Sequence, residues 1–307
     1  MPKRPRRKLT KRLNGDRGFF TLALCFALAV TALFTLVLYE LARGSRLSVA
    51  EAGASLLSAE WNPGHGRFGQ LPFIYGTLVS STLALGLALP LSLLSAVFLV
   101  EMCPRGIADL LSSVIELIAA IPSVVIGLWG IFVLAPVVRD YIQPALSKLS
   151  FIPLFSGRTM GLSMLTAVLV LALMITPIIT SLSKEAIASV PAELKDGLYA
   201  LGATRLEVMK YVVIPYAKRG ILAAAVLGYA RAIGETMAVT MVIGNTPVIS
   251  ASLLSPAYTL AAVIANEFVE ATSEVYVSAL VASGLILFIM SALVSLAGRA
   301  LARGGVG

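Results

Sequence analysis

Long uncharged runs of apolar residues recur along the chain. Five of them exceed the roughly 20 residues that a helix needs to cross the hydrocarbon core of a bilayer. These runs are Phe19–Tyr39, Phe68–Val100, Leu117–Val138, Thr159–Ser183 and Val275–Gly298. A sixth stretch, from Gly220 to about Ile243, has the length and apolarity of a span although Arg231 and Glu235 interrupt it. The pattern predicts an all-α, polytopic membrane protein with six transmembrane helices.

The composition agrees with this class and excludes an ordinary soluble domain. Of the 307 residues, 58% are hydrophobic and 13% are charged, and the mean hydropathy is +0.91. A net charge of +8 would indicate a nucleic-acid partner only if a folded soluble domain presented a basic face. Membrane lipid is therefore the expected surrounding partner, and nucleic acid is not expected as one.

The basic residues are distributed unevenly between the two sides of the predicted membrane protein. Eight of the 24 Lys and Arg residues precede Phe19. With six crossings, the segments on the side of the termini hold 17 basic residues, and those on the opposite side hold 6. Since cytoplasmic loops carry the excess of Lys and Arg, both termini are expected in the cytoplasm.

The first apolar run is expected to stay in the protein as a transmembrane helix. A cleavable secretory signal is the alternative, but Phe19–Tyr39 has 21 uncharged residues and no convincing small-residue cleavage site follows it. We divide the chain accordingly. Residues 1–70 form a basic cytoplasmic N-terminus, the first helix and an outer loop. Residues 71–307 form a five-helix core with a cytoplasmic loop at 184–219.

The uncharged stretch from Thr236 to Asn266 is too long to be only the end of the fifth span. Asn245, Pro247 and Pro256 interrupt it, which favours a re-entrant or interfacial segment on the outer side. An additional full crossing is the alternative, and it would place the C-terminal arginines outside. The sequence leaves open whether 246–266 re-enters the membrane.

The loop at 184–219 has the pattern of two short helices joined at a glycine. Pro191 suits a first helical turn, and Leu194, Leu198 and Leu201 then recur on one face. Gly202 is expected to end this helix. An amphipathic helix of this kind fits the groove of a protein partner, and mixed charge argues against the alternative of a helix lying on lipid.

A second helix is expected to follow immediately. Thr204 and Glu207 have the spacing of a capping box, in which each side chain bonds the other residue's backbone N–H group. This helix is expected to run towards Pro215.

Arg231 and Glu235 are the notable charges within an apolar span. An ionised side chain at the centre of a membrane helix costs about 3 kcal/mol or more, so both need a partner or a wet cavity. Their i, i+4 spacing allows an ion pair, which is either structural or the holder of an arginine that binds an anion. Further candidates for a substrate path are Thr236, Ser123 and Glu116, the last placed near the inner end of the third helix.

No motif for an enzymatic reaction was found. The chain has no Walker motif, so any ATP that drives transport must be hydrolysed by another polypeptide. Its two cysteines, Cys25 and Cys103, are not expected to pair, and no Cys/His cluster suggests a metal. We expect no cofactor and no metal.

Two sets of motifs carry a family resemblance. The segment DGLYALGATRLEVMKYVVIP, which starts at Asp196, resembles the EAA loop of ABC importer permeases, although Asp196, Gly197 and Leu198 stand where that pattern has Glu, Ala and Ala. RAIGETMAVTMVIGN from Arg231, FIYGTLVSS and AAIPSVVIGLWGIF resemble the PstC-type permeases of phosphate-specific ABC importers. The resemblance covers roughly Gly69 to Arg299.

The resemblance implies a type I ABC importer of inorganic phosphate in a bacterial plasma (inner) membrane. The implied partners are a second homologous permease, two ATPase subunits and an extracytoplasmic phosphate-binding protein. The residues implied in ATPase coupling are Glu193, Asp196, Leu198, Leu201, Gly202, Ala203, Thr204 and Pro215. The alternatives are an ABC permease for another oxyanion, such as sulfate or molybdate, and a self-sufficient anion transporter that needs no ATP.

Overall fold

Six helices of the structure are long and apolar enough to cross a membrane. The computed structural model describes residues 7–149, 151–157 and 159–303. Residues 1–6 of the predicted N-terminal segment, and Ser150, Arg158 and residues 304–307 of the predicted core, lie outside this part. The candidate spans are Gly18–Gly44, Leu71–Met102, Ser123–Ser147, Met164–Ala188, Arg205–Gly234 and Glu274–Ala300. The predicted number of spans and the all-α class are confirmed.

The helices follow one another along the chain, and irregular segments of different lengths connect them. The α-helices are α1 (Arg7–Gly44), α2 (Arg46–Ala52), α3 (Leu71–Val97), α4 (Arg105–Ala119), α5 (Ser123–Trp129), α6 (Ala135–Val137), α7 (Gln143–Ser147), α8 (Met164–Ala188), α9 (Ala192–Ala200), α10 (Arg205–Val208), α11 (Ile214–Gly234), α12 (Met237–Val242), α13 (Leu260–Glu267) and α14 (Glu274–Arg303). The π-helical turns are η3 (Phe98–Met102), η4 (Gly130–Leu134), η5 (Val138–Ile142) and η7 (Met209–Val213). The 3₁₀ turns are η1 (Gly53–Leu57), η2 (Pro63–His65) and η6 (Pro153–Phe155), and the strands β1 (Trp61–Asn62) and β2 (Arg67–Phe68) form an antiparallel pair.

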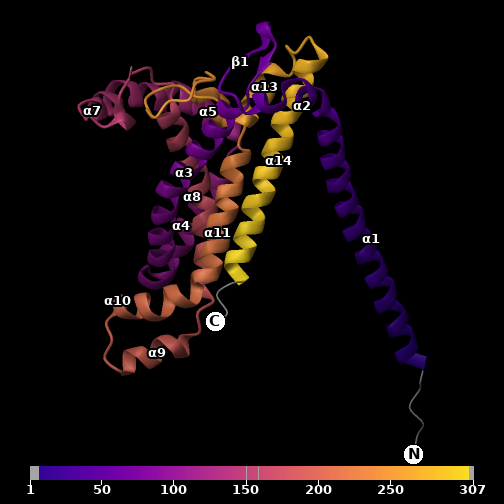
Figure 1. Cartoon of the computed structure of the whole chain (residues 1–307). Coiled ribbons are helices and arrows are strands. Elements are labelled where there is room, and N and C mark those ends of the chain that lie inside the picture. The colour runs from indigo at the N-terminus through magenta and orange to yellow at the C-terminus, as the bar shows by residue number, and fades with distance from the viewer. Residues whose placement is uncertain (1–6, 150, 158, 304–307) are drawn as a thin grey trace, which may run out of the picture.

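The bundle is built around α8, with α3 and α11 packed against it and α14 against α11 (Figure 1). Of the α8 span, 67% is buried, whereas none of the α1 span is. Small residues bring the helices close together. A Cβ atom on Gly228 of α11 would lie 2.6 Å from Ile179 of α8, so a larger residue there would force these helices apart.

The prediction of one helix over Leu117–Val138 is wrong. The chain is helical up to Ala119, breaks, and starts α5 at Ser123 after Pro122. The break lies at a proline, which has no N–H group to continue a helix. The amphipathic helix α4 lies beside α8. Helices α5 to α7, which are a candidate span by length and composition, extend along the opposite end of the bundle from α9 and α10 (Figure 1). We call the end with α9 and α10 the inner end and the opposite one the outer end.

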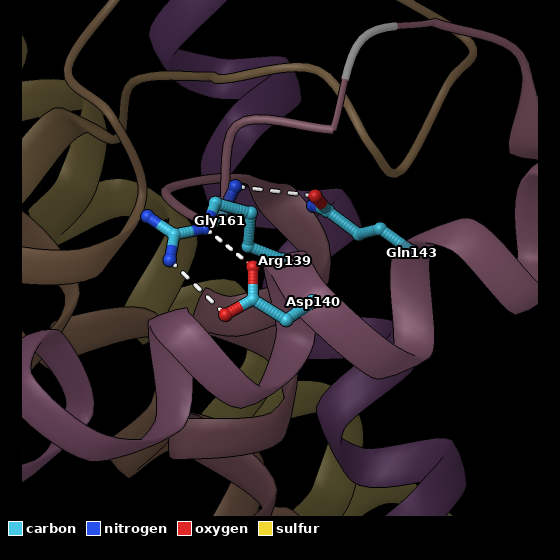
Figure 2. Close-up of polar contacts among 4 residues, drawn as sticks. All are labelled: Arg139, Asp140, Gln143 and Gly161. Atoms are coloured by element: carbon cyan, nitrogen blue, oxygen red, sulfur yellow. Dashed lines mark hydrogen bonds and ion pairs between the residues drawn. The ribbon is translucent and has the colours of Figure 1, made fainter.

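A buried glutamine fixes the arm formed by α5 to α7 to the turn before α8. Gln143 is fully buried; its Oε1 accepts a hydrogen bond from the Gly161 N–H group at 3.1 Å, and its Nε2 donates to Ser163 Oγ at 3.1 Å. Gly161 has a φ of 79°, and a Cβ atom there would lie 2.8 Å from the carbonyl oxygen of Ala135. Figure 2 shows the exposed Arg139–Asp140 ion pair beside this contact. The arm is therefore anchored at its far end.

The stretch between α12 and α13 is irregular, and most of its residues are buried or half-buried. Its backbone groups find partners on the bundle: the Met164 N–H group donates to the Ser255 carbonyl at 3.0 Å, and Leu165 donates to Leu253 at 2.8 Å. These hydrogen bonds supply partners that irregular backbone would need at membrane depth. Within residues 236–266, all of them described, no helix has the length of a crossing, so the alternative of an additional span is wrong.

Helix α1 leaves the bundle at an angle and approaches it only at the outer end (Figure 1). There the Ser278 hydroxyl of α14 donates to the Gly44 carbonyl at 2.7 Å and accepts from the Ser48 N–H group at 3.0 Å. The start of α1 and the end of α14 lie on the same side as α9 and α10 (Figure 1). This arrangement agrees with an even number of crossings.

An aromatic cluster holds the outer strand pair against the bundle. Trp61 packs edge-on against Phe73, and its Nε1 donates to Glu267 Oε2 at 3.0 Å. Tyr276 donates to the same carboxylate oxygen at 2.6 Å. Burial raises the pKa of the neighbouring Tyr258 phenol above its ordinary value, so this hydroxyl stays protonated at physiological pH. The cluster packs the strand pair β1–β2 against α3 and α14.

Candidate functional site

Arg231 and Glu235 lie together where α11 ends. The two side chains are 3.8 Å apart, between Arg231 NH2 and Glu235 Oε2, so the predicted i, i+4 ion pair is present. The predicted span from Gly220 to about Ile243 is not a single helix. Helix α11 ends at Gly234, Glu235 has an extended backbone, and α12 starts at Met237. The pair therefore stands at a helix break, where a charged group meets exposed backbone groups as well as side chains.

Arg231 and Glu235 differ in how far their side chains are buried and in how many contacts each makes within the chain. The Arg231 side chain is 44% exposed, whereas that of Glu235 is 7% exposed. Glu235 Oε1 also accepts a hydrogen bond from the Ala238 N–H group at 3.4 Å. The carboxylate is thus fixed by its surroundings, and among the described residues the guanidinium has one loose ion-pair contact. Its planar set of donors is accessible to an anion.

The other predicted path residues are not joined to this pair. Thr236 is its sequence neighbour, and its hydroxyl lies 3.4 Å from the Gly234 carbonyl, to which it donates. Ser123 opens α5, which packs closely on α12 at Gly127, where a Cβ atom would lie 3.0 Å from Ala238 Cα. Over the described ranges, no hydrogen bond or ion pair links Ser123 or Glu116 to Arg231 or Glu235.

The sequence predicted that Glu116 lies near the inner end of the third helix, and this prediction is wrong. Helix α4 begins at Arg105, directly after the inner end of α3, so Glu116 lies about 16 Å along it at 1.5 Å per residue. It shares one exposed face with Asp109 and Ser113, at spacings of seven and three residues. An exposed carboxylate on a helix inside the bilayer must face water or another protein.

Helix α9 and the glycine turn after it agree with the sequence in most respects. Pro191 precedes the helix as its cap, one position earlier than predicted. Gly202 has a φ of 85° and ends the helix, with its N–H group donating to the Tyr199 carbonyl at 2.9 Å. A residue with a Cβ atom is strained in this conformation, which is why glycine occupies it.

The predicted capping box is present at the start of α10. The Thr204 N–H group donates to Glu207 Oε2 at 2.7 Å, and the Glu207 N–H group donates to Thr204 Oγ1 at 3.4 Å. The second helix runs towards Pro215, as expected from the sequence, and extends beyond it. It continues through the π-helical turn Met209–Val213 into α11, so the helix runs unbroken from Arg205 to Gly234.

The predicted leucine stripe does not form one buried face. Leu198 is half-buried in an apolar cluster, but Leu194 is 47% exposed and Leu201 is 84% exposed.

Leu206, on the other side of the glycine turn, is 81% exposed. Of the remaining predicted coupling residues, Ala203 is half-buried, and the exposed ones are Glu193, Asp196, Gly202, Thr204 and Pro215. Leu201 and Leu206 are thus exposed apolar side chains on either side of the glycine turn, and we call them the apolar tip.

Sequence reasoning missed one contact at this end of the protein. Lys195 of α9 forms an ion pair with Glu101 at the inner end of α3, with 2.6 Å between Nζ and Oε1. The two residues are 94 positions apart. Glu101 directly follows a long uncharged run, and Lys195 lies between the acidic residues Glu193 and Asp196. No local pattern could have identified them as partners.

Comparison with known proteins identifies membrane components of transport systems as relatives of this chain. The family model described as "Binding-protein-dependent transport system inner membrane component" matches residues 88–304. The phosphate transport system permease protein PstC of Mesorhizobium japonicum is 44% identical over 91% of this chain and 87% of its own length. The protein of the same name from Haemophilus influenzae is 41% identical over 89% of each chain. A probable ABC transporter permease, YqgH of Bacillus subtilis, is 36% identical over 92% of this chain and 88% of its own.

Solved structures share the fold at low sequence identity. A chain of a bacterial ABC transporter that imports the acidic polysaccharide alginate has a TM-score of 0.59 and 15% identity, covering 96% of this chain and 100% of that chain. A chain of the inward-facing methionine transporter MetNI has a TM-score of 0.58 and 16% identity, covering 80% of this chain and 99% of that chain. With the six spans and the family match over 88–304, this chain belongs to the inner-membrane components of binding-protein-dependent transport systems and is a multi-pass protein of the inner membrane.

Proposed function

We propose that this chain is a permease subunit of an ATP-driven importer of inorganic phosphate. The observation that carries the proposal is the 41% to 44% identity, over about nine-tenths of the chain, to proteins named as phosphate transport system permeases. The aligned region is long enough to include the segment around Arg231 and Glu235. The alternatives of a sulfate or molybdate permease and of a self-sufficient transporter have no comparable support.

Arg231 is the residue that we assign to contact with phosphate in the translocation path. Its guanidinium offers two parallel N–H groups to two oxygens of one anion, and its 44% exposure leaves it accessible from outside the chain. Glu235, only 3.8 Å away, keeps the arginine oriented and is a weaker partner than a bidentate anion. An arriving phosphate would replace this carboxylate as the partner of the Arg231 guanidinium.

The remaining path residues line the approach to this position. Thr236 and Ser123 can donate hydroxyl hydrogen bonds to phosphate oxygens. The face of α4 with Asp109, Ser113 and Glu116 would border the aqueous path or the second permease, because exposed carboxylates are not stable against lipid. The path thus requires a second homologous permease to close it.

The energy for transport would enter at the inner end. We assign the loop at 184–219, and within it the tip formed by Leu201 and Leu206, to docking in a groove of a cytoplasmic ATPase. Two ATPase subunits, one for each permease, and an extracytoplasmic phosphate-binding protein complete the proposed importer. ATP hydrolysis would take place on the ATPase polypeptides.

The proposed topology places both termini and the α9–α10 end in the cytoplasm. The excess of Lys and Arg in these segments supports it. We retain the division into residues 1–70, which include the first span, and a core of residues 71–307. The divergence of α1 from the other helices supports this division.

Purification of the chain from its native membrane tests the class of transporter. We expect a second permease and an ATPase to purify with it, and we expect the chain reconstituted alone to move no phosphate. Phosphate transport by the isolated chain without ATP would contradict the proposal. Purification in detergent with Leu201→Asp as a matched variant should release the ATPase and leave the second permease bound.

A further inference from the structure

The ion pair between Glu101 and Lys195 differs from the other ion pairs in the described part of the chain. Its side chains are 11% and 18% exposed. In three of the other pairs both side chains are at least half exposed, and in the Arg231–Glu235 pair the arginine is 44% exposed. A short contact between two largely buried charges is hard to separate, because each charge would be left without a partner in an apolar environment.

The pair joins two segments that the chain does not connect directly. Lys195 lies in the middle of α9, and Glu101 lies on the π-helical turn η3 that ends α3. The loop that contains α9 continues into α8 on one side and α11 on the other, so their movement follows the loop covalently. Helix α3 is not covalently joined to this loop. Among the described residues, its links to α9 are the ion pair and an apolar cluster of buried side chains against which Val97, Val100 and Leu198 all pack.

At its other end, α3 is attached to the irregular outer segment. The Leu260 N–H group donates to Thr77 Oγ1 at 3.0 Å, and the Tyr75 hydroxyl donates to the Ser250 carbonyl at 2.6 Å. Gly76 allows this close approach, because a Cβ atom there would lie 2.1 Å from the Tyr258 carbonyl oxygen. Helix α3 therefore connects α9 at the inner end with residues 250–260 at the outer end.

We propose that Glu101 and Lys195 are positioning residues that transmit a displacement of α9 through α3 to the outer segment at 250–260. This inference rests on the proposed function, in which the ATPase moves α9. The reverse direction follows from the same contact: a binding protein that changes the outer segment would alter how α9 is presented to the ATPase. The pair is thus assigned to the coupling of ATP hydrolysis to transport, beyond holding the loop in its fold.

The test measures the ATP hydrolysed per phosphate transported by the complete importer in proteoliposomes, with loaded binding protein. For Lys195→Met we expect this ratio to rise about tenfold, within the range of typical coupling energies, while the assembled complex is recovered in normal amount. The double variant Glu101→Lys with Lys195→Glu, which restores the pair in reverse, should return the ratio close to that of the wild type. Arg139→Gln, which breaks an exposed pair, is the matched control and should leave the ratio unchanged.

An unchanged ratio in Lys195→Met would overturn the inference and leave the pair a structural contact. So would a reversed pair that assembles but stays uncoupled. If Lys195→Met does not assemble, Glu101→Gln is measured in the same way, since it removes the charge and keeps the size of the side chain. Failure of the proposed function is distinguishable, because the wild-type importer would then show no ATP-driven phosphate uptake before any variant is compared.

Discussion

Replacement of Arg231 by alanine is expected to lower ATP-driven phosphate uptake by about 100-fold or more, while the importer still assembles. Two charge-assisted hydrogen bonds of about 1.5 kcal/mol each correspond to a factor of this size. The change also leaves the carboxylate of Glu235, which is 7% exposed, without its cation and facing the incoming anion. Uptake of radiolabelled phosphate and the amount of purified complex are measured together.

Two further variants separate charge from geometry at this position. Arg231→Lys keeps the charge but loses the planar fork, so its uptake should lie between that of the wild type and that of Arg231→Ala. Arg139→Ala serves as the matched control, because exposed ion pairs contribute at most about 1 kcal/mol. Normal uptake by Arg231→Ala would reduce the Arg231–Glu235 pair to a structural role.

Gly202→Asp is expected to abolish stimulation of the ATPase by the permease. The φ of 85° at this position costs a residue with a Cβ atom about 1–2 kcal/mol, although the space around it is open. The added carboxylate would also lie between Leu201 and Leu206, in the apolar tip that we assign to docking. ATPase activity and association of the ATPase with the purified permeases are the measurements.

The controls for this change come from the same side of the protein. Gly202→Ala introduces the backbone strain without the charge, so a smaller loss is expected. Gly106→Asp adds the same side chain at an exposed glycine in the first turn of α4, where a negative charge suits the helix dipole and nothing lies within 4 Å. Undiminished ATPase stimulation with Gly202→Asp would remove this loop from the coupling mechanism.

The membrane class could be predicted from run lengths because the bilayer imposes a minimum helix length. Run length alone gave a wrong prediction for the third helix, Leu117–Val138, which the structure divides between α4 and α5. Counting uncharged residues overlooked α4, whose face with Asp109 and Glu116 is exposed while Ala108 and Ser112 are buried. A periodic apolar pattern was present in Arg105–Ala119, so a search for amphipathic helices would have found it.

Contacts between residues near each other in sequence were predictable, and distant ones were not. Thr204 and Glu207 form their capping box through local backbone geometry, and Arg231 and Glu235 meet at helical spacing. The Glu101–Lys195 pair depends on how α3 packs against the loop, and no pattern local to either residue indicates that packing. The course of the chain through Pro215 depends on the π-helical turn before it, which absorbs the change of direction from α10 to α11 (Figure 1).

The most direct test of the account is phosphate uptake by the reconstituted importer. This chain, its co-purified permease and ATPase, and the loaded binding protein are placed in proteoliposomes with ATP on the side of α9 and α10. We predict accumulation of radiolabelled phosphate that requires ATP and that excess sulfate or molybdate does not suppress. Accumulation without ATP, or uptake of sulfate or molybdate in preference to phosphate, would contradict the assignment of this chain to ATP-driven phosphate import.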